Sequence, residues 1–245
     1  RNNTISSCTG GGNSSFSTSD DGAGGGGGGG GGFAVVFANA VSSGTFSSSS
    51  SSNEVAIRNN TISSCTGGGN SSFSTTGSSV CGSGGDAAGA LVAYASAATV
   101  NYACTSSNNA LSVVGNAWDS VSALGAARCL DPGALCGTAG ALAVLYTTPG
   151  ATLSGNAHAF ADNSFENCTA DLVDGGSIGA NSGLTAGVAI LYYLPQASSG
   201  PQNNSHRFAR NRFVGGTAAQ RGSAVRLLLG SGEDNNTASF AGNKF

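Results

Sequence analysis

Apolar residues recur along the chain in short clusters separated by glycine, serine and asparagine. The clusters at Phe33–Phe37, Ala90–Tyr94, Leu142–Tyr146 and Val188–Tyr193 are rich in Val, Leu, Phe and Tyr. Short runs of this kind, bounded by turn-forming residues, are typical of β-strands. Heptads are absent and strong helix formers are scarce, so the pattern predicts an all-β fold.

Two sequence patterns repeat in phase over the whole chain. Residues 1–18 recur identically as residues 58–75, and a fainter form, apolar-x-x-Asn-x-apolar, extends this repeat. Its asparagines are Asn3, Asn60, Asn116, Asn163, Asn211 and Asn243. Midway between them, apolar runs follow Gly32, Gly89, Gly140, Gly187 and Gly222. Two signals in phase indicate a repeat protein.

The spacing of the asparagines is elastic, from 57 residues between Asn3 and Asn60 to 32 between Asn211 and Asn243. An elastic period with intact strand motifs favours a solenoid whose insertions are loops. We therefore predict one single-stranded parallel β-helix domain over residues 1–245, with about five coils. The coils start near Asn3, Asn60, Asn116, Asn163 and Asn211. The runs 24–32 and 47–52, all Gly and all Ser, are expected to lie in loops outside it.

The repeated asparagines have a structural role in such a fold. Asparagine tolerates the left-handed backbone of a sharp turn, and the side-chain amides of stacked asparagines form hydrogen bonds with one another as a ladder. We expect this ladder at Asn3, Asn60, Asn116, Asn163, Asn211 and Asn243. The flanking apolar residues should stack inward in two columns, one of Phe160, Phe208 and Phe240 and the other of Ile62, Trp118, Phe165, Phe213 and Phe245.

The alternation of Gly-Ala-apolar segments with Phe-x-x-Asn resembles the repeats of polymorphic outer-membrane-protein-like surface proteins. The Phe-x-x-Asn form is literal at Phe160, Phe208 and Phe240 and relaxed at Ile57 and Val113. The resemblance covers nearly the whole chain, although each motif is short. It implies a right-handed parallel β-helix and a passenger or adhesin-like surface role. The Gly and Ser homopolymers are more typical of a GC-rich eukaryote such as an alga.

Seven cysteines are present without the spacing of a metal site. Cys8, Cys65 and Cys168 each follow a repeat asparagine by five residues, so they should share one stacking position. Stacked neighbours lie within disulfide range, which makes Cys8–Cys65 a candidate pair. Cys81, Cys104, Cys129 and Cys136 are expected in or near loops. Their pairs Cys81–Cys104 and Cys129–Cys136 are one of three possible pairings.

Seven Asn-x-Ser/Thr sequons are candidates for N-glycosylation: Asn2, Asn13, Asn59, Asn70, Asn167, Asn203 and Asn235. Several sequons would arise by chance in a chain this rich in Asn, Ser and Thr. Two of them, Asn2 and Asn13, nevertheless recur as Asn59 and Asn70 in the copy of residues 1–18. Charged residues make up only 9% of the chain, so glycans would supply hydration that charge does not.

Composition also argues against several partners. The net charge is -3, so no basic surface exists to neutralise nucleic-acid phosphates. No apolar stretch is long enough to span a membrane. The glycine run lacks the Lys-Ser/Thr of a phosphate loop, and only two histidines, His158 and His206, could join a zinc site. We predict no cofactor and no metal.

The acidic residues bear on whether the chain could be an enzyme. Polysaccharide-cleaving β-helices need clustered acids from neighbouring coils. Asp119 and Glu166 both follow a repeat asparagine by three residues and could stack, but the pattern strongly favours two solvated side chains on the outer face of the strands. The basic residues Arg207, Arg210, Arg212, Arg221 and Arg226 are expected to balance local acids or to contact a partner.

The sequence therefore favours a non-enzymatic structural glycoprotein, located outside the cell or at its surface. Its β-helix would form part of a longer chain or associate head to tail into a filament, because the chain begins and ends on motif copies. An adhesin or carbohydrate-binding β-helix is the alternative, which exposed aromatic residues in the loops would favour. A polysaccharide lyase or hydrolase is the third hypothesis.

Overall fold

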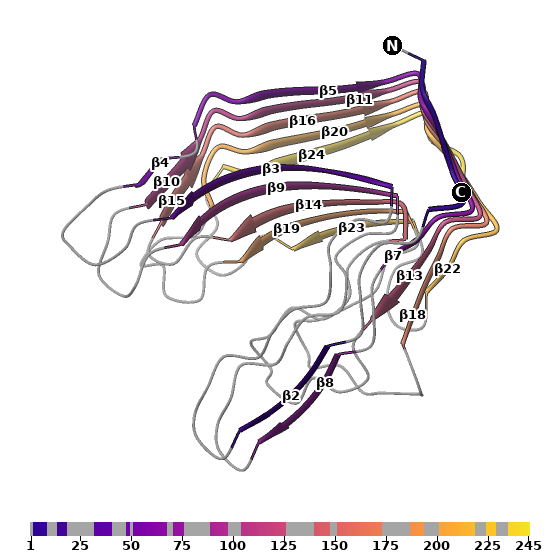
Figure 1. Ribbon diagram of the computed structural model, residues 1–245. Helices are drawn as coiled ribbons and strands as arrows, with labels where there is room; N and C mark the ends of the chain where they lie inside the picture. Colours follow the sequence, from indigo (N-terminus) through magenta and orange to yellow (C-terminus); the bar gives the residue numbers. More distant parts are fainter. Residues whose placement is uncertain are drawn as a thin grey trace.

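The computed structural model of the protein is built from strands and turns, and contains no helix in the part that it describes (Figure 1). The described residues are 2–8, 14–18, 32–40, 48–49, 51–67, 71–75, 89–97, 104–125, 140–147, 151–172, 187–193, 201–218, 224–228 and 235–245. All strand pairs of these residues are parallel, and the prediction of an all-β fold is confirmed.

Two five-stranded sheets flank the predicted asparagine motif. Sheet I holds β5 (Glu54–Arg58), β11 (Ala110–Val114), β16 (Ala157–Ala161), β20 (Ser205–Ala209) and β24 (Thr237–Ala241). Sheet II holds β1 (Thr4–Ser6), β6 (Thr61–Ser63), β12 (Ala117–Asp119), β17 (Ser164–Glu166) and β21 (Arg212–Val214). One asparagine motif joins each of β5, β11, β16 and β20 of sheet I to the next strand of sheet II, and Asn243 follows β24.

The apolar runs after glycine form a third long sheet. Sheet III holds β3 (Phe33–Ala40), β9 (Ala90–Ala97), β14 (Leu142–Thr147), β19 (Val188–Tyr193) and β23 (Val225–Leu228). Figure 1 shows it beneath sheet I. Val92, Val144 and Ile190 are buried in it, and Leu111 and Phe160 are buried in sheet I. The two sheets therefore share one interior.

Three smaller sheets complete the described architecture. Sheet IV holds β7 (Thr66–Gly67), β13 (Ser122–Gly125), β18 (Thr169–Leu172) and β22 (Thr217–Ala218). Sheet V holds β4 (Ser48–Ser49), β10 (Cys104–Ser107) and β15 (Ala151–Ser154). Sheet VI pairs β2 (Ser14–Thr18) with β8 (Ser71–Thr75).

Successive repeats lie directly over one another in register. Ile62 pairs with Trp118, and Trp118 pairs in turn with Phe165. The side chains alternate in strands such as β5, where Val55 and Ile57 are buried and the residues between them are exposed. Such alternation places one face of the strand in the core.

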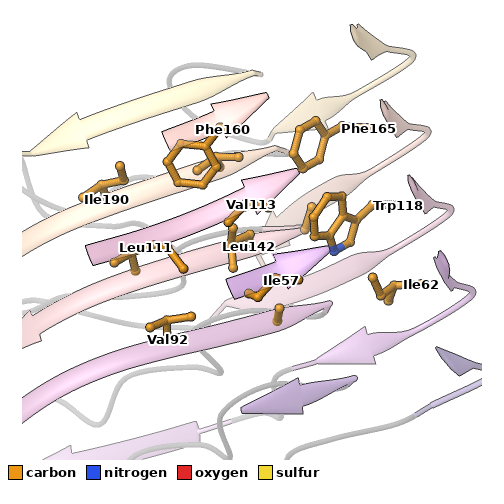
Figure 2. Packing of buried hydrophobic residues seen from close by; sticks show 14 of the residues in the cluster. Ile57, Ile62, Val92, Leu111, Val113, Trp118, Leu142, Phe160, Phe165 and Ile190 are labelled. Carbon is orange, nitrogen blue, oxygen red and sulfur yellow. The ribbon is translucent and has the colours of Figure 1, made fainter. Parts of the chain in front are cut away.

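Stacked aromatic rings form the predicted columns. The ring centroids of Trp118 and Phe165 are 4.7 Å apart, as are those of Phe165 and Phe213, and Figure 2 shows the first pair inside the sheets. Phe160 stacks on Phe208 in the second column, also at 4.7 Å. Nearly parallel rings at the spacing of adjacent strands follow from the in-register pairing.

One sequence expectation about loops is wrong. The serine run was expected outside the sheets, yet Ser48 and Ser49 form β4, which pairs with β10. Cys104, expected in or near a loop, is the first residue of β10. The register of the neighbouring repeat supplies hydrogen-bond partners to both segments, and this outweighs their weak strand propensity.

Candidate functional site

The first ladder is the row of six asparagines singled out by the repeat. The Nδ2 group of each donates to the Oδ1 atom of the next, over 2.9 to 3.1 Å. The row runs in the order Asn3, Asn60, Asn116, Asn163, Asn211 and Asn243. The structure thus brings all six amides together.

Each interior amide of the first ladder also holds the backbone, as Asn163 illustrates. Its Nδ2 group donates to Oδ1 of Asn211 and to the carbonyl oxygen of Val113 in β11, both over 2.9 Å. Its Oδ1 atom accepts from the backbone N–H and from the Nδ2 group of Asn116. All four hydrogen-bonding positions of this buried amide are therefore used within the fold.

A second ladder, which our sequence analysis missed, lies between sheet V and sheet I. Its side chains are joined by Nδ2–Oδ1 bonds of 2.9 Å in the order Asn53, Asn109, Asn156, Asn204 and Asn236. Each of these residues precedes a first-ladder asparagine by seven positions. That constant interval was the signal that could have revealed the row, although its flanking residues lack the aromatic pattern.

The residue before a ladder asparagine makes the corner possible. It has a positive φ in ten corners, between 53° and 68°. These residues are Ser52, Asn59, Asn108, Gly115, Gly155, Asp162, Asn203, Arg210, Asn235 and Gly242. Left-handed backbone reverses the chain direction locally, and asparagine and glycine tolerate it best.

A third corner, here called the cysteine corner, carries no ladder. It contains Cys8, Cys65, Val121, Cys168 and Gly216, whose carbonyl oxygens in the first four repeats accept from the next strand. The predicted Cys8–Cys65 disulfide is present, with the Cα atoms 4.5 Å apart. Cys168 is a buried free thiol, and burial raises its pKa to about 12. Cys81, Cys129 and Cys136 lie outside the described residues, so their pairings stay predictions.

Five of the seven sequons lie in the described part of the chain. Their asparagines are all exposed: Asn2, Asn59, Asn167, Asn203 and Asn235. Each occupies the corner position, four before a ladder asparagine and Asn167 at the cysteine corner. Asn13 and Asn70 lie outside the described residues. The exposed corners meet the steric requirement of a glycan acceptor.

The candidate carboxylates stack as expected on the outer face of sheet II. Asp119 pairs in register with Glu166. Glu166 accepts from the Arg212 guanidinium and from Ser164 Oγ at 2.8 Å, and Asp119 is exposed. Neither carboxylate is enclosed in the apolar pocket typical of an acid catalyst.

A neighbouring ion pair involves two of the corner residues. Arg210 binds Asp162 through two bonds of 2.7 Å, and this contact lowers the pKa of the Asp162 carboxyl. Arg210 and Arg212 thus balance local acids, as predicted for the basic residues. Arg221 lies outside the described residues.

The two histidines, for which sequence suggested no role, lie together in the core. His158 and His206 pair in register, with Nδ1 atoms 3.0 Å apart and rings stacked at 4.9 Å between centroids. Nε2 of His158 lies 2.8 Å from the hydroxyl of Tyr146 in β14. Burial lowers the pKa of His206 to about 4, and burial together with His206 holds the pKa of His158 well below its usual value.

Comparison of the chain with protein-family models, curated proteins and solved structures found no match. Within the described residues no helix could cross a membrane. The same residues contain no group of three or more His, Cys, Asp or Glu arranged to hold a metal ion. The corners, the ladders and the disulfide are therefore the features of the molecule that bear on its function.

Proposed function

We propose that this chain is a parallel β-helix segment of a non-enzymatic structural glycoprotein, in an extracellular filament, cell surface or wall. Each repeat would form one coil, passing through sheets V, I, II, IV and III in turn. Uniform parallel pairing and two amide ladders support this path. The buried polar side chains of the ladders bind one another and the backbone, which suits a scaffold better than a reactive site.

The Cys8–Cys65 disulfide is the observation that carries the proposal. It joins equivalent corners of two successive repeats. Disulfides persist in oxidising compartments such as the secretory pathway and the extracellular space. A covalent link between adjacent coils therefore supports a secreted, mechanically continuous stack.

The distribution of hydroxyl residues supports glycosylation at the corners. Asparagine occupies the position before a ladder asparagine in five corners, at residues 2, 59, 108, 203 and 235. In four of them Ser or Thr is the third residue and completes a sequon. At Asn108 the third residue is Ala110, so no sequon forms. In the other six corners only Ser164 is a hydroxyl residue at that third position. The left-handed backbone of the corner explains why asparagine occurs there, but it does not explain why Ser or Thr occurs two residues later.

A further repeat, of this chain or of a second copy, would continue the same contacts. Phe240 and Phe245 extend the two aromatic columns and remain 50% and 75% exposed in the last described repeat. Another repeat in the same register would stack on these rings and pair with β24. Open stacking of this kind produces filaments when the rotation does not close.

The test is intact-mass spectrometry of the chain secreted from eukaryotic cells, before and after enzymatic removal of N-glycans. The variants Thr61→Ala, Ser205→Ala and Thr237→Ala each abolish one sequon without changing its asparagines. Alanine occupies this outward position naturally at Ala110, Ala117 and Ala157. Ser164→Ala, at an equivalent position outside any sequon, is the matched control.

We expect each of the three variants to lose one glycan mass while Ser164→Ala loses none. Non-reducing peptide mapping should recover the Cys8–Cys65 link, and electron microscopy should show elongated particles that join end to end. A bare mass near 23.6 kDa would refute the glycoprotein. Compact, dispersed particles would refute the filament.

A further inference from the structure

The histidine column of sheet I is polar in only two of its repeats. From β5 to β24 the inward column contains Val55, Leu111, His158, His206 and Ala238. His158 and His206 are each 2% exposed. Because Val55 and Leu111 fill this position in earlier repeats, packing alone does not require a histidine side chain there.

Hydrogen bonding links the pair to the opposite sheet. The two Nδ1 atoms, 3.0 Å apart, share one proton, because one nitrogen must donate and the other accept. Tyr146 from sheet III closes the chain at Nε2 of His158, over 2.8 Å. The neutral histidines therefore connect two neighbouring repeats and both long sheets.

The described residues in register with this column are uncharged. The neighbouring strands present Leu111 from β11 and Ala238 from β24, and β14 presents Tyr146. Arg207 flanks His206 but is exposed on the outer face. On β23, Arg226 is half-buried and its Nη1 atom has almost no exposed surface, but like Arg207 it is a cation and cannot compensate a proton.

We propose that Tyr146, His158 and His206 form an acid-sensitive lock, which holds the stack closed while both histidines are neutral and opens it there when they are protonated. A first proton places a cation in the apolar interior. A second places two N–H donors face to face. Both penalties are relieved by opening the repeats to water.

The pH range follows from linkage. The folded-state pKa values lie below the unfolded value of about 6.5, so the unfolded chain binds more protons. The contribution to stability is complete above pH 6.5 and is lost progressively as pH falls toward 4. Each histidine then raises the unfolding equilibrium constant by up to roughly tenfold per pH unit.

The test compares the wild-type chain with an apolar version of the lock, Tyr146→Phe, His158→Leu and His206→Leu. Both replacements occur naturally at equivalent positions of other repeats. Leu111 lies in the same column as the histidines, and Phe37 lies in the same register as Tyr146. Urea unfolding is followed at pH 7.5, 6.5, 5.5 and 5.0. Trp118, the single tryptophan, is fully buried against Phe165 and reports opening of the interior by fluorescence.

We expect the unfolding constant of the wild type, relative to the variant, to rise at least tenfold between pH 6.5 and 5.0. The carboxylates are common to both proteins and cancel in the comparison. Equal pH dependence of the two proteins would overturn the lock. If the variant does not fold, NMR of the wild type decides: histidine ring protons that titrate near pH 6.5 in the folded state would overturn it, and their silence above pH 5 would support it.

Discussion

The ladder corners and the cysteine corner solve the same backbone problem in different ways. Both place a left-handed residue outside the turn, such as Asp162 at the first ladder and Ser120 at the cysteine corner. The next residue points inward in each case: Asn163 is 2% exposed and Val121 is fully buried. The inward side chain is always asparagine in the ladders but varies among Cys, Val and Gly at the cysteine corner.

The difference shows which constraint acts at each corner. A ladder amide donates to and accepts from its neighbours, so a different residue in one repeat leaves polar groups unpaired in two others. At the cysteine corner the inward residue need only be small, and the disulfide joins two repeats and not all of them. Sequence variation should therefore be tolerated there and not in the ladders.

The largest expected effect separates a ladder residue from a corner residue. Asn163→Ala removes four hydrogen bonds of a buried amide and should lower the free energy of unfolding by about 4 kcal/mol. Asn156→Ala in the second ladder should cost a similar amount. Asn203→Gly, at an exposed left-handed position, should change it by less than about 0.5 kcal/mol. Urea denaturation measures all three, and equal effects would remove the distinction.

The disulfide should have the next largest effect. Cys8→Ala with Cys65→Ala opens a link across 57 residues and should cost about 2–4 kcal/mol. Cys168→Ala, at the same corner without a disulfide, is the matched control and should cost only about 1 kcal/mol. Thermal unfolding under oxidising and reducing conditions should show a smaller reductant effect in the double variant than in the wild type or Cys168→Ala. A reductant effect there would mean that another disulfide contributes.

A corner glycine offers a smaller and more local test. Gly115 has a φ of +67°, and a Cβ atom there would lie 2.4 Å from Oδ1 of Asn59. Gly115→Ala should therefore cost about 1–2 kcal/mol. Adding Asn59→Gly removes the contact but not the backbone strain, so the double variant should recover part of the loss. Full recovery in a double-mutant cycle would place the whole penalty in the contact.

The smallest expected effect concerns the exposed ion pair. The Asp162 pKa is lowered by Arg210, so the pair stabilises the fold above the usual carboxyl pKa of 3.8, and this contribution disappears as pH falls through the lowered value. Both side chains are open to solvent, so Arg210→Gln should change stability only slightly, and less at 1 M salt. A large, salt-independent loss would show that Arg210 has a packing role.

The first ladder could be predicted because large apolar residues flank its asparagines at constant positions. Phe160 and Phe165 bracket Asn163 in the same way that Phe208 and Phe213 bracket Asn211. The second ladder lacks such markers, since Leu153 is buried before Asn156 but the residues after it include His158. In the sequence its asparagines are marked only by their constant interval of seven residues from the first ladder, and their hydrogen bonds to the next repeat identify them as a ladder.

Short-range pattern alone was enough to place the strands of sheets I, II and III, the inward aromatic residues and the first row of asparagines. Alternation and turn chemistry depend on neighbours a few residues away, and the repeat copies them. The contacts of His158 with His206, of Ser48 with Cys104 and of Asn156 with Asn204 needed the folded structure. These residues are 48 to 56 positions apart, and the intervening segments vary in length. Only the interstrand hydrogen bonds set their register, and the register decides which side chains meet.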